Sequence, residues 1–391
     1  MEPSNQQIPA LVHILLKAKR LDDARHILRD SIGLVSADLV EKLISLSDHY
    51  SDKGDLEKAL RLVNLAIDAA DMVGEDQFRA DSLFTKAVIL HRASHLNSAR
   101  KYYEQASKHY RALGAKLDLA NCQGNLGLIA QDLGHLSQAF EYHKTALDLS
   151  RQSGDLAAQL ADLTNISAVY YSQGDYPRAE EGYREVLKLA VELESPEDEM
   201  NALSGLGLIY RARGELDKAQ NVFERALNLA RQMNTPESEA AYLGNLGLVY
   251  QDLGELKRSL EAHQESAALH LKVGNRQGQA SQLANAANVY YALGEISRAE
   301  ELHLEALKLH RAISFQRGQA EELSNLALIR RIKGDYDNAL RLAHQALTID
   351  QEIGDLRGEA ADWGNIGIIY LQLGEFDRAA KTGAWRTVKP E

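Results

Sequence analysis

The sequence has little proline and a single cysteine. Its 391 residues include 6 prolines and 27 glycines, whereas proline makes up roughly 5% of an average protein. A disordered chain, or a fold with many long loops, uses more proline than this. The single cysteine, Cys122, excludes an intrachain disulfide framework and a cysteine-rich zinc site. Scarce proline with ordinary glycine therefore favours a helical chain with short turns at glycine.

A basic surface and a long apolar run are also missing. The chain has 44 Lys and Arg against 56 Asp and Glu, a net charge of −12, whereas nucleic acids and anionic membranes attract basic proteins. No apolar stretch approaches the roughly 20 residues of a membrane span. The first apolar run is broken by Pro9 and His13 and is not preceded by a basic region, unlike a signal peptide. We therefore expect a cytoplasmic protein that binds neither nucleic acid nor membranes.

What the sequence does contain is an internal repeat of 40 residues. A turn glycine recurs at this spacing, and a serine fills one vacancy: Gly54, Ser94, Gly134, Gly174, Gly214, Gly254, Gly294, Gly334 and Gly374. A small residue stands five positions later in every unit, from Ala59 and Ala99 to Ala379. Before most of these turns lies an Asn-Leu-Gly-like triplet, such as residues 125–127 and 245–247, and a tyrosine often follows it. A phase held over eight periods indicates one structural unit used repeatedly.

Each period predicts two antiparallel helices joined by the glycine turn. In residues 117–156, Leu119, Leu126 and Ile129 recur at helical spacing, and a second apolar helical pattern follows Gly134. Three of the prolines mark expected helix starts. They are Pro177, Pro196 and Pro236, and the last two follow hydroxyl residues suited to capping, Ser195 and Thr235.

This pattern of small residue, tyrosine, glycine and alanine resembles the tetratricopeptide repeat (TPR). The resemblance covers roughly residues 4–380 and implies an all-α TPR solenoid, a right-handed superhelix of antiparallel helix hairpins whose concave wall is lined by first helices. A common TPR has about 34 residues, whereas this period of 40 resembles the repeats of the Pins/LGN adaptors and, less closely, of kinesin light chain.

The repeat phase divides the chain into three parts. Residues 1–36 are expected to form a degenerate hairpin, residues 37–356 eight complete units, and residues 357–391 a partial ninth unit with a tail. A solenoid needs a polar cap, and the last hairpin is cut short. Its apolar face is covered by Trp385 folding back, by self-association through this open C-terminal end, or by a further domain. The sequence leaves these three open.

The candidate binding residues lie on the first helices. The family resemblance implies that a mid-helix asparagine, unfavourable for a helix, holds the backbone of an extended peptide. The alternative is that it braces the neighbouring repeat. The asparagines are Asn125, Asn165, Asn245, Asn285, Asn325 and Asn365. A variable position six residues later would select the partner: Gln131, Tyr171, Arg211, Gln251, Tyr291 and Arg331, with Asn288 as a further contact.

Catalytic and metal-binding motifs are not found in the sequence. His143, His263 and His303 share one repeat phase, and equivalent positions about 10 Å apart are too far from each other to share an ion. The family resemblance places these histidines where an aromatic residue packs between helices, as at Tyr183 and Phe223, so we expect them in the core. We also expect Cys122, on an apolar helix face, in the core, and we expect no cofactor. The favoured function is a non-enzymatic adaptor that binds an extended, partly acidic segment of a partner protein, with Arg211 and Arg331 pairing with its acidic groups. The alternative is a peptide- or ligand-sensing regulatory region that controls an effector.

Overall fold

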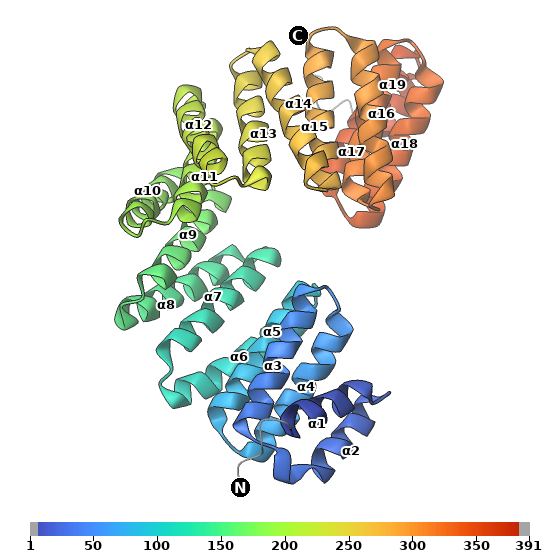
Figure 1. Ribbon diagram of the computed structural model, residues 1–391. Helices are drawn as coiled ribbons and strands as arrows, with labels where there is room; N and C mark the ends of the chain where they lie inside the picture. The colour runs from blue at the N-terminus through green and yellow to red at the C-terminus, as the bar shows by residue number, and fades with distance from the viewer. Residues whose placement is uncertain (1–6, 383–391) are drawn as a thin grey trace. The chain divides into compact units, whose positions relative to one another are not determined.

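The computed structural model describes residues 7–382, which form twenty α-helices, one short 3₁₀ helix and no strand (Figure 1). The helices are α1 (Gln7–Lys17), α2 (Leu21–Asp30), α3 (Ala37–Asp52), α4 (Leu56–Val73), α5 (Asp76–Arg92), α6 (Leu96–Leu113), α7 (Lys116–Asp132), α8 (Leu136–Ser153), α9 (Leu156–Ser172), α10 (Tyr176–Glu192), α11 (Pro196–Ala212), α12 (Leu216–Gln232), α13 (Pro236–Asp252), α14 (Leu256–Lys272), α15 (Arg276–Ala292), α16 (Ile296–Ala312), α17 (Gln316–Ile332), α18 (Tyr336–Ile353), α19 (Leu356–Gln372) and α20 (Phe376–Lys381), with η1 at Ile32–Leu34.

Successive helices pair as hairpins. Odd-numbered helices from α3 onward are the first helices, and α5 with α6, α7 with α8 and α13 with α14 are among the pairs in closest contact. From α5 onward the first helices begin at residues 76, 116, 156, 196, 236, 276, 316 and 356, one every 40 residues. The predicted all-α hairpin repeat is confirmed.

The chain divides into two compact units, one ending at Asp198 and the other beginning at Glu199. In the first unit, α3 contacts α5 and α7 contacts α9. In the second, α13 contacts α15 and α17 contacts α19. Within each unit the first helices of neighbouring hairpins therefore lie side by side, and they form a shared surface. The division at residues 36 and 356 drawn from the repeat phase stays a prediction.

The turns inside the hairpins follow the glycine pattern. Their glycines have φ between 73° and 79°, and Ser94 adopts the same left-handed conformation with φ of 59°. Several second helices begin with an aspartate cap, for example Asp175, whose side chain accepts from the backbone N–H of Arg178. The expected hydroxyl cap at Thr235 is wrong: its hydroxyl donates to the carbonyl oxygen of Ala230 in the preceding helix, and it caps nothing.

The contact between the two helices of a hairpin depends on a glycine facing a ring. A Cβ placed on Gly127 would lie 2.5 Å from the His143 ring, and one on Gly207 would lie 2.5 Å from the Phe223 ring. Gly247 and His263 repeat this arrangement. The expected burial of His143, His263 and His303 is confirmed, as is that of Cys122.

A tyrosine near the end of many first helices lies beneath a basic side chain eight residues later. The Arg258 guanidinium is 4.0 Å from the centre of the Tyr250 ring, and Arg178 is 4.6 Å from that of Tyr170. Such cation–π pairs contribute about 0.5–1 kcal/mol at exposed sites. Each of these pairs lies within one hairpin.

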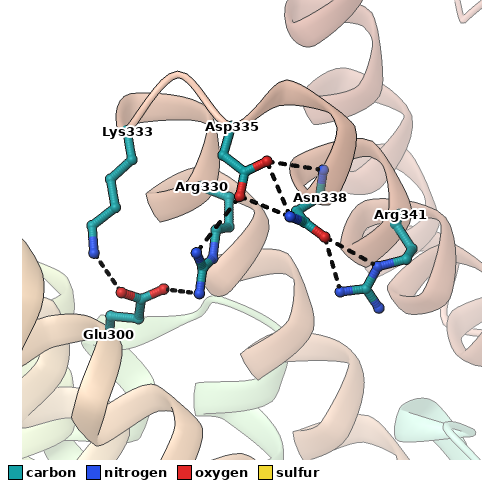
Figure 2. A network of polar contacts seen from close by, with 6 residues as sticks. All are labelled: Glu300, Arg330, Lys333, Asp335, Asn338 and Arg341. Atoms are coloured by element: carbon teal, nitrogen blue, oxygen red, sulfur yellow. Dashed lines mark hydrogen bonds and ion pairs between the residues drawn. The ribbon is translucent and has the colours of Figure 1, made fainter.

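The hairpin of α17 and α18 replaces this pair with ion pairs (Figure 2). Arg330 stands where the tyrosine is elsewhere, and its Nη2 lies 2.6 Å from Oε1 of Glu300 on α16. Lys333 pairs with the same carboxylate, and Arg330 also approaches Asp335, which accepts from the Asn338 amide. Glu300 therefore binds two cations from the following hairpin.

The C-terminal hairpin is short, as expected, because α20 has six residues. Trp385, one of the groups expected to cover the last apolar face, lies outside the described residues. Among residues 7–382, no helix has both the length and the apolar character that a membrane crossing requires.

Candidate functional site

The six candidate asparagines occupy equivalent places on first helices, and all are half-buried. Asn125 on α7 and Asn165 on α9 line one hollow in the first unit. The other four lie in the second unit on α13, α15, α17 and α19, where Asn365 contacts Ser324 beside Asn325. We call the surface that carries these asparagines in each unit the ladder face.

Two of the asparagine amides are used within the chain. The Tyr103 hydroxyl donates to Asn125 Oδ1 at 3.2 Å, and Asn125 Nδ2 donates to the Asn121 carbonyl. Asn365 Nδ2 donates to the Ser324 hydroxyl at 3.2 Å, and this hydrogen bond braces the neighbouring repeat. In residues 7–382 no hydrogen bond is made by the side chains of Asn165, Asn245, Asn285 and Asn325. Most of the ladder therefore offers unused amide donors and acceptors.

The second row of candidates is half-buried as well, and part of it is engaged. His143 Nε2 donates to Gln131 Oε1 at 2.9 Å, so Gln131 supports a core histidine. Arg211 Nε lies 2.6 Å from Asp252 Oδ2 of the next first helix, with 33% and 37% of the two side chains exposed. The Tyr171 ring packs against Tyr176.

The remaining members of that row are Gln251, Tyr291 and Arg331. No ion pair to Arg331 occurs within the described part of the chain, which leaves its guanidinium available. Arg211 can bind an acidic group only in competition with Asp252.

The same helices also carry an apolar row that the sequence pattern did not predict. Three residues after the ladder position lie Leu128, Ala168, Leu208, Leu248, Asn288, Leu328 and Ile368, all half-buried or exposed. Leu128 is 37% exposed and Ile368 is 42% exposed. Asn288, predicted as a contact, is the one amide in this otherwise apolar row. The sequence does contain a signal for this row. The position three residues after the asparagine, a leucine after Asn125, does not lie on the core face, and yet it is apolar in most repeats.

Buried polar side chains also form hydrogen bonds between neighbouring hairpins. His263 Nδ1 donates to Gln282 Oε1 at 2.8 Å, and His303 Nδ1 donates to Glu322 Oε2 at 2.6 Å. In the last interface the Ser324 hydroxyl donates to Asp362, which is 1% exposed. Burial, with a smaller contribution from Asp350, raises the pKa of Asp362 to about 6. These contacts hold adjacent repeats together.

The ladder face offers hydrogen bonding and apolar contact.

No group of three or more His, Cys, Asp or Glu side chains suited to a metal ion occurs between residues 7 and 382. Cys122 is buried, and burial raises the pKa of its thiol to about 12, so it remains an unreactive thiol.

Comparison with known families identifies the repeat. The MalT-like TPR region matches residues 128–384, well over half of the chain, and a tetratricopeptide repeat model matches residues 79–152. The chain belongs to the MalT-like TPR family. The TPR resemblance inferred from the sequence is thereby confirmed. A comparison with curated proteins gives no match.

Solved structures share the TPR fold at low sequence identity. The apo form of the quorum sensor NprR from B. thuringiensis is 14% identical with a TM-score of 0.65, over 88% of this chain and 97% of that one. A STAND protein with a TPR sensor from Pyrococcus horikoshii is 16% identical with a TM-score of 0.63. That alignment covers 92% of this chain but 55% of that one, so this chain spans about half its length. A Rap protein complexed with Competence and Sporulation Factor is 13% identical with a TM-score of 0.54, over 87% and 100% of the two chains.

Proposed function

We propose that the protein is a non-enzymatic TPR module that binds an extended peptide segment of a partner protein on its ladder face. The observation that carries the proposal is the set of four half-buried asparagine amides without an intrachain hydrogen bond. Asparagine lowers helix stability at mid-helix positions, and these four amides gain no intrachain hydrogen bond that offsets this cost. An extended peptide backbone supplies both the donor and the acceptor that each amide lacks.

The neighbouring rows give the segment its side-chain contacts. The apolar row that begins at Leu128 favours apolar side chains in the partner, and Arg331 favours an acidic one. First helices in contact are about 8–10 Å apart, and an extended chain advances about 3.3 Å per residue. One repeat therefore meets about three residues of the segment. The likeness of the asparagine ladder to the Pins/LGN adaptors supports the same mode of binding.

The test uses a phage-displayed library of random dodecapeptides selected against the whole chain. Asn245 and Asn285, on neighbouring first helices of one unit, are both changed to alanine. We expect selected peptides to lose at least about tenfold in affinity, since two backbone-directed amides are removed. The helical content should stay unchanged, and the melting temperature should not fall, because alanine is the better helix former at both positions.

The matched control changes Asn221 and Asn228 to alanine. Both are exposed on the second helix α12, so affinity should be retained. The proposal is contradicted if every selected peptide binds the Asn245→Ala, Asn285→Ala variant, and the equivalent Asn125→Ala, Asn165→Ala variant of the first unit, as tightly as the wild type.

A sensing function is the second candidate, favoured by similar structures described as sensors or as bound to a factor. In this case the bound segment changes the conformation of the module and so controls an effector. Small-angle scattering with and without a selected peptide separates the two functions. An unchanged radius of gyration counts against sensing by a change of shape.

A further inference from the structure

The hollow between α7 and α9, in the first unit, is an unusual part of the ladder face. It measures about 160 Å³ and is lined by Asn121, Gly124, Asn125, Leu128, Asp162 and Asn165, with alanines completing the wall. Asp162 is its one charged lining residue, and 7% of it is exposed. A nearly buried carboxylate in the wall of a hollow lined with amides favours a hydrogen-bond donor as its partner.

The two oxygens of Asp162 have different surroundings. Oδ2 accepts from the Ser150 hydroxyl at 2.9 Å. Oδ1 lies toward Gly124, 3.7 Å from the place where a Cβ on that glycine would be. No donor to Oδ1 is found in the described part of the chain. Oδ1 is not fully buried, so it is an accessible acceptor without an intrachain donor.

The last interface in the described part of the chain has the same aspartate with a donor at that position. Asp362 stands 200 residues after Asp162, in the same repeat register, and Ser324 stands 200 residues after Gly124. There the Ser324 hydroxyl donates to Asp362 Oδ1. At Gly124 the side chain that would supply this donor is missing, so the equivalent space opens into the hollow.

The charges around the hollow favour a cation. Helix α9 has no lysine or arginine, and α7 has Lys116 only, in its first turn. Asp155 at the start of α9 adds a second negative charge close enough to raise the pKa of Asp162, although burial is the larger cause, and that pKa is about 6. Asp162 is therefore mainly ionised at neutral pH. A cationic donor would satisfy Oδ1 and neutralise its charge.

We propose that this hollow is a subsite for a cationic side chain, lysine or arginine, of the bound segment, which donates a hydrogen bond to Asp162 Oδ1 in the place that Ser324 takes at Asp362. Asn121 and Asn165 belong to the same lining, and an asparagine amide oxygen can accept a further hydrogen bond from the cation. This inference rests on the proposed peptide binding. It adds a preference for a basic residue at this place in the first unit.

The test replaces the missing hydroxyl. Gly124→Ser places a donor next to Asp162 at a helical position where a Cβ makes ordinary contact, and serine is more favourable than glycine within a helix. Dodecapeptides selected by phage display against the wild type are synthesised with each lysine and arginine replaced in turn by uncharged norleucine. For one basic position, we expect the replacement to weaken binding to the wild type about tenfold and binding to Gly124→Ser by less than twofold.

Two further variants complete the experiment. Gly364→Ser makes the same change at the equivalent position of α19, where a Cβ would have no neighbour within 4 Å, and should keep the wild-type dependence on the basic residue. Asp162→Asn should lose that dependence, as Gly124→Ser does. A Gly124→Ser variant that melts no lower than the wild type shows that the result is not due to unfolding.

The outcomes separate this inference from the function on which it rests. A library that yields no binding peptide overturns both. Peptides that bind the Asn165→Ala variant more weakly contact the first unit. If such peptides depend on no basic residue, or if their dependence survives Gly124→Ser, the cationic subsite is overturned and the peptide-binding function still stands. The peptide residue whose replacement weakens binding to the wild type but not to Gly124→Ser is either a lysine or an arginine, and its identity shows which cation the hollow binds.

Discussion

At the scale of single residues, the buried rings take part in two kinds of contact. His143 and His263 pack flat on a glycine of the facing helix, as Phe223 does, and also form one hydrogen bond through a ring nitrogen. The second ring nitrogen of each has no partner in the described residues. Packing on the glycine thus appears in all three hairpins, whereas the polar contact appears in two. The contact between these helices therefore requires a flat ring, and it does not require a polar one.

His143→Phe tests this at the residue scale. Burial lowers the pKa of His143 to about 4, whereas histidine in an unfolded chain has a pKa of about 6.5. Between these values the unfolded chain binds a proton that the folded chain does not, so stability falls as pH falls through this window. Phenylalanine repeats the pairing of Phe223 with Gly207 and does not titrate.

Urea unfolding at pH 7 and pH 4.5 measures the effect. We expect His143→Phe to change stability by less than about 1.5 kcal/mol at pH 7. Its loss of stability on acidification should be smaller than that of the wild type by about 2–3 kcal/mol. His95→Phe, at an exposed histidine, is the control for the substitution and should change stability at pH 7 by less than about 0.5 kcal/mol. Equal acid sensitivity of His143→Phe and the wild type would show that this histidine does not titrate as described.

The sequence predicted which histidines are buried, because their repeat phase coincides with that of Tyr183 and Phe223. It did not indicate that Asp162 lies under Gly124. That contact joins residues 38 positions apart across two hairpins, so it depends on the stacking of repeats and not on the period within one helix. The unsatisfied amides of the ladder were likewise visible only once their neighbours were placed.

At the scale of helices and turns, glycine in the left-handed conformation ends the first helix of each hairpin. Ser94 occupies that conformation in the hairpin of α5 and α6. The conformation costs a residue with a Cβ about 1–2 kcal/mol, and glycine avoids this cost but loses more chain entropy on folding. The helix boundaries were predicted well because these turns recur. The cap at Thr235 was wrong because a hydroxyl before a helix can also donate to the preceding helix.

Ser94→Gly should therefore stabilise the protein, by about 0.5–1 kcal/mol after the entropy of the unfolded chain is included. Thermal unfolding followed by circular dichroism measures the change. Ser137→Gly, at an exposed position within α8 where the backbone is helical, should destabilise the protein by a similar amount. A decrease in melting temperature for Ser94→Gly would mean that the serine side chain stabilises this turn.

At the scale of the whole molecule, stability is expected to be local. In an array each hairpin contacts its neighbours, and the free energy of folding is approximately a sum of repeat and interface contributions. The chain divides at residue 198, although the 40-residue period continues through that point. The period alone therefore did not predict the two units.

Phe223→Ala should show this locality. Phe223 is fully buried in α12, and its truncation is expected to cost about 3–5 kcal/mol. Hydrogen exchange measured by mass spectrometry should accelerate in α11 to α14 and stay unchanged in α3 to α6. Phe376→Ala, at a side chain that is 60% exposed, should change neither. Equal acceleration along the entire chain would indicate a single cooperative unit.

The ion pairs of Glu300 limit how the repeats can be rearranged. A hairpin whose tyrosine lies under its own arginine carries that contact with it when a 40-residue block is duplicated, deleted or moved. The block containing Arg330 and Lys333 does not carry its contacts with it, because both cations pair with a carboxylate of the preceding block. Deleting the block with Glu300 would leave two like charges close together. These two hairpins are therefore expected to be inherited, or transplanted into a designed array, as a single piece of 80 residues.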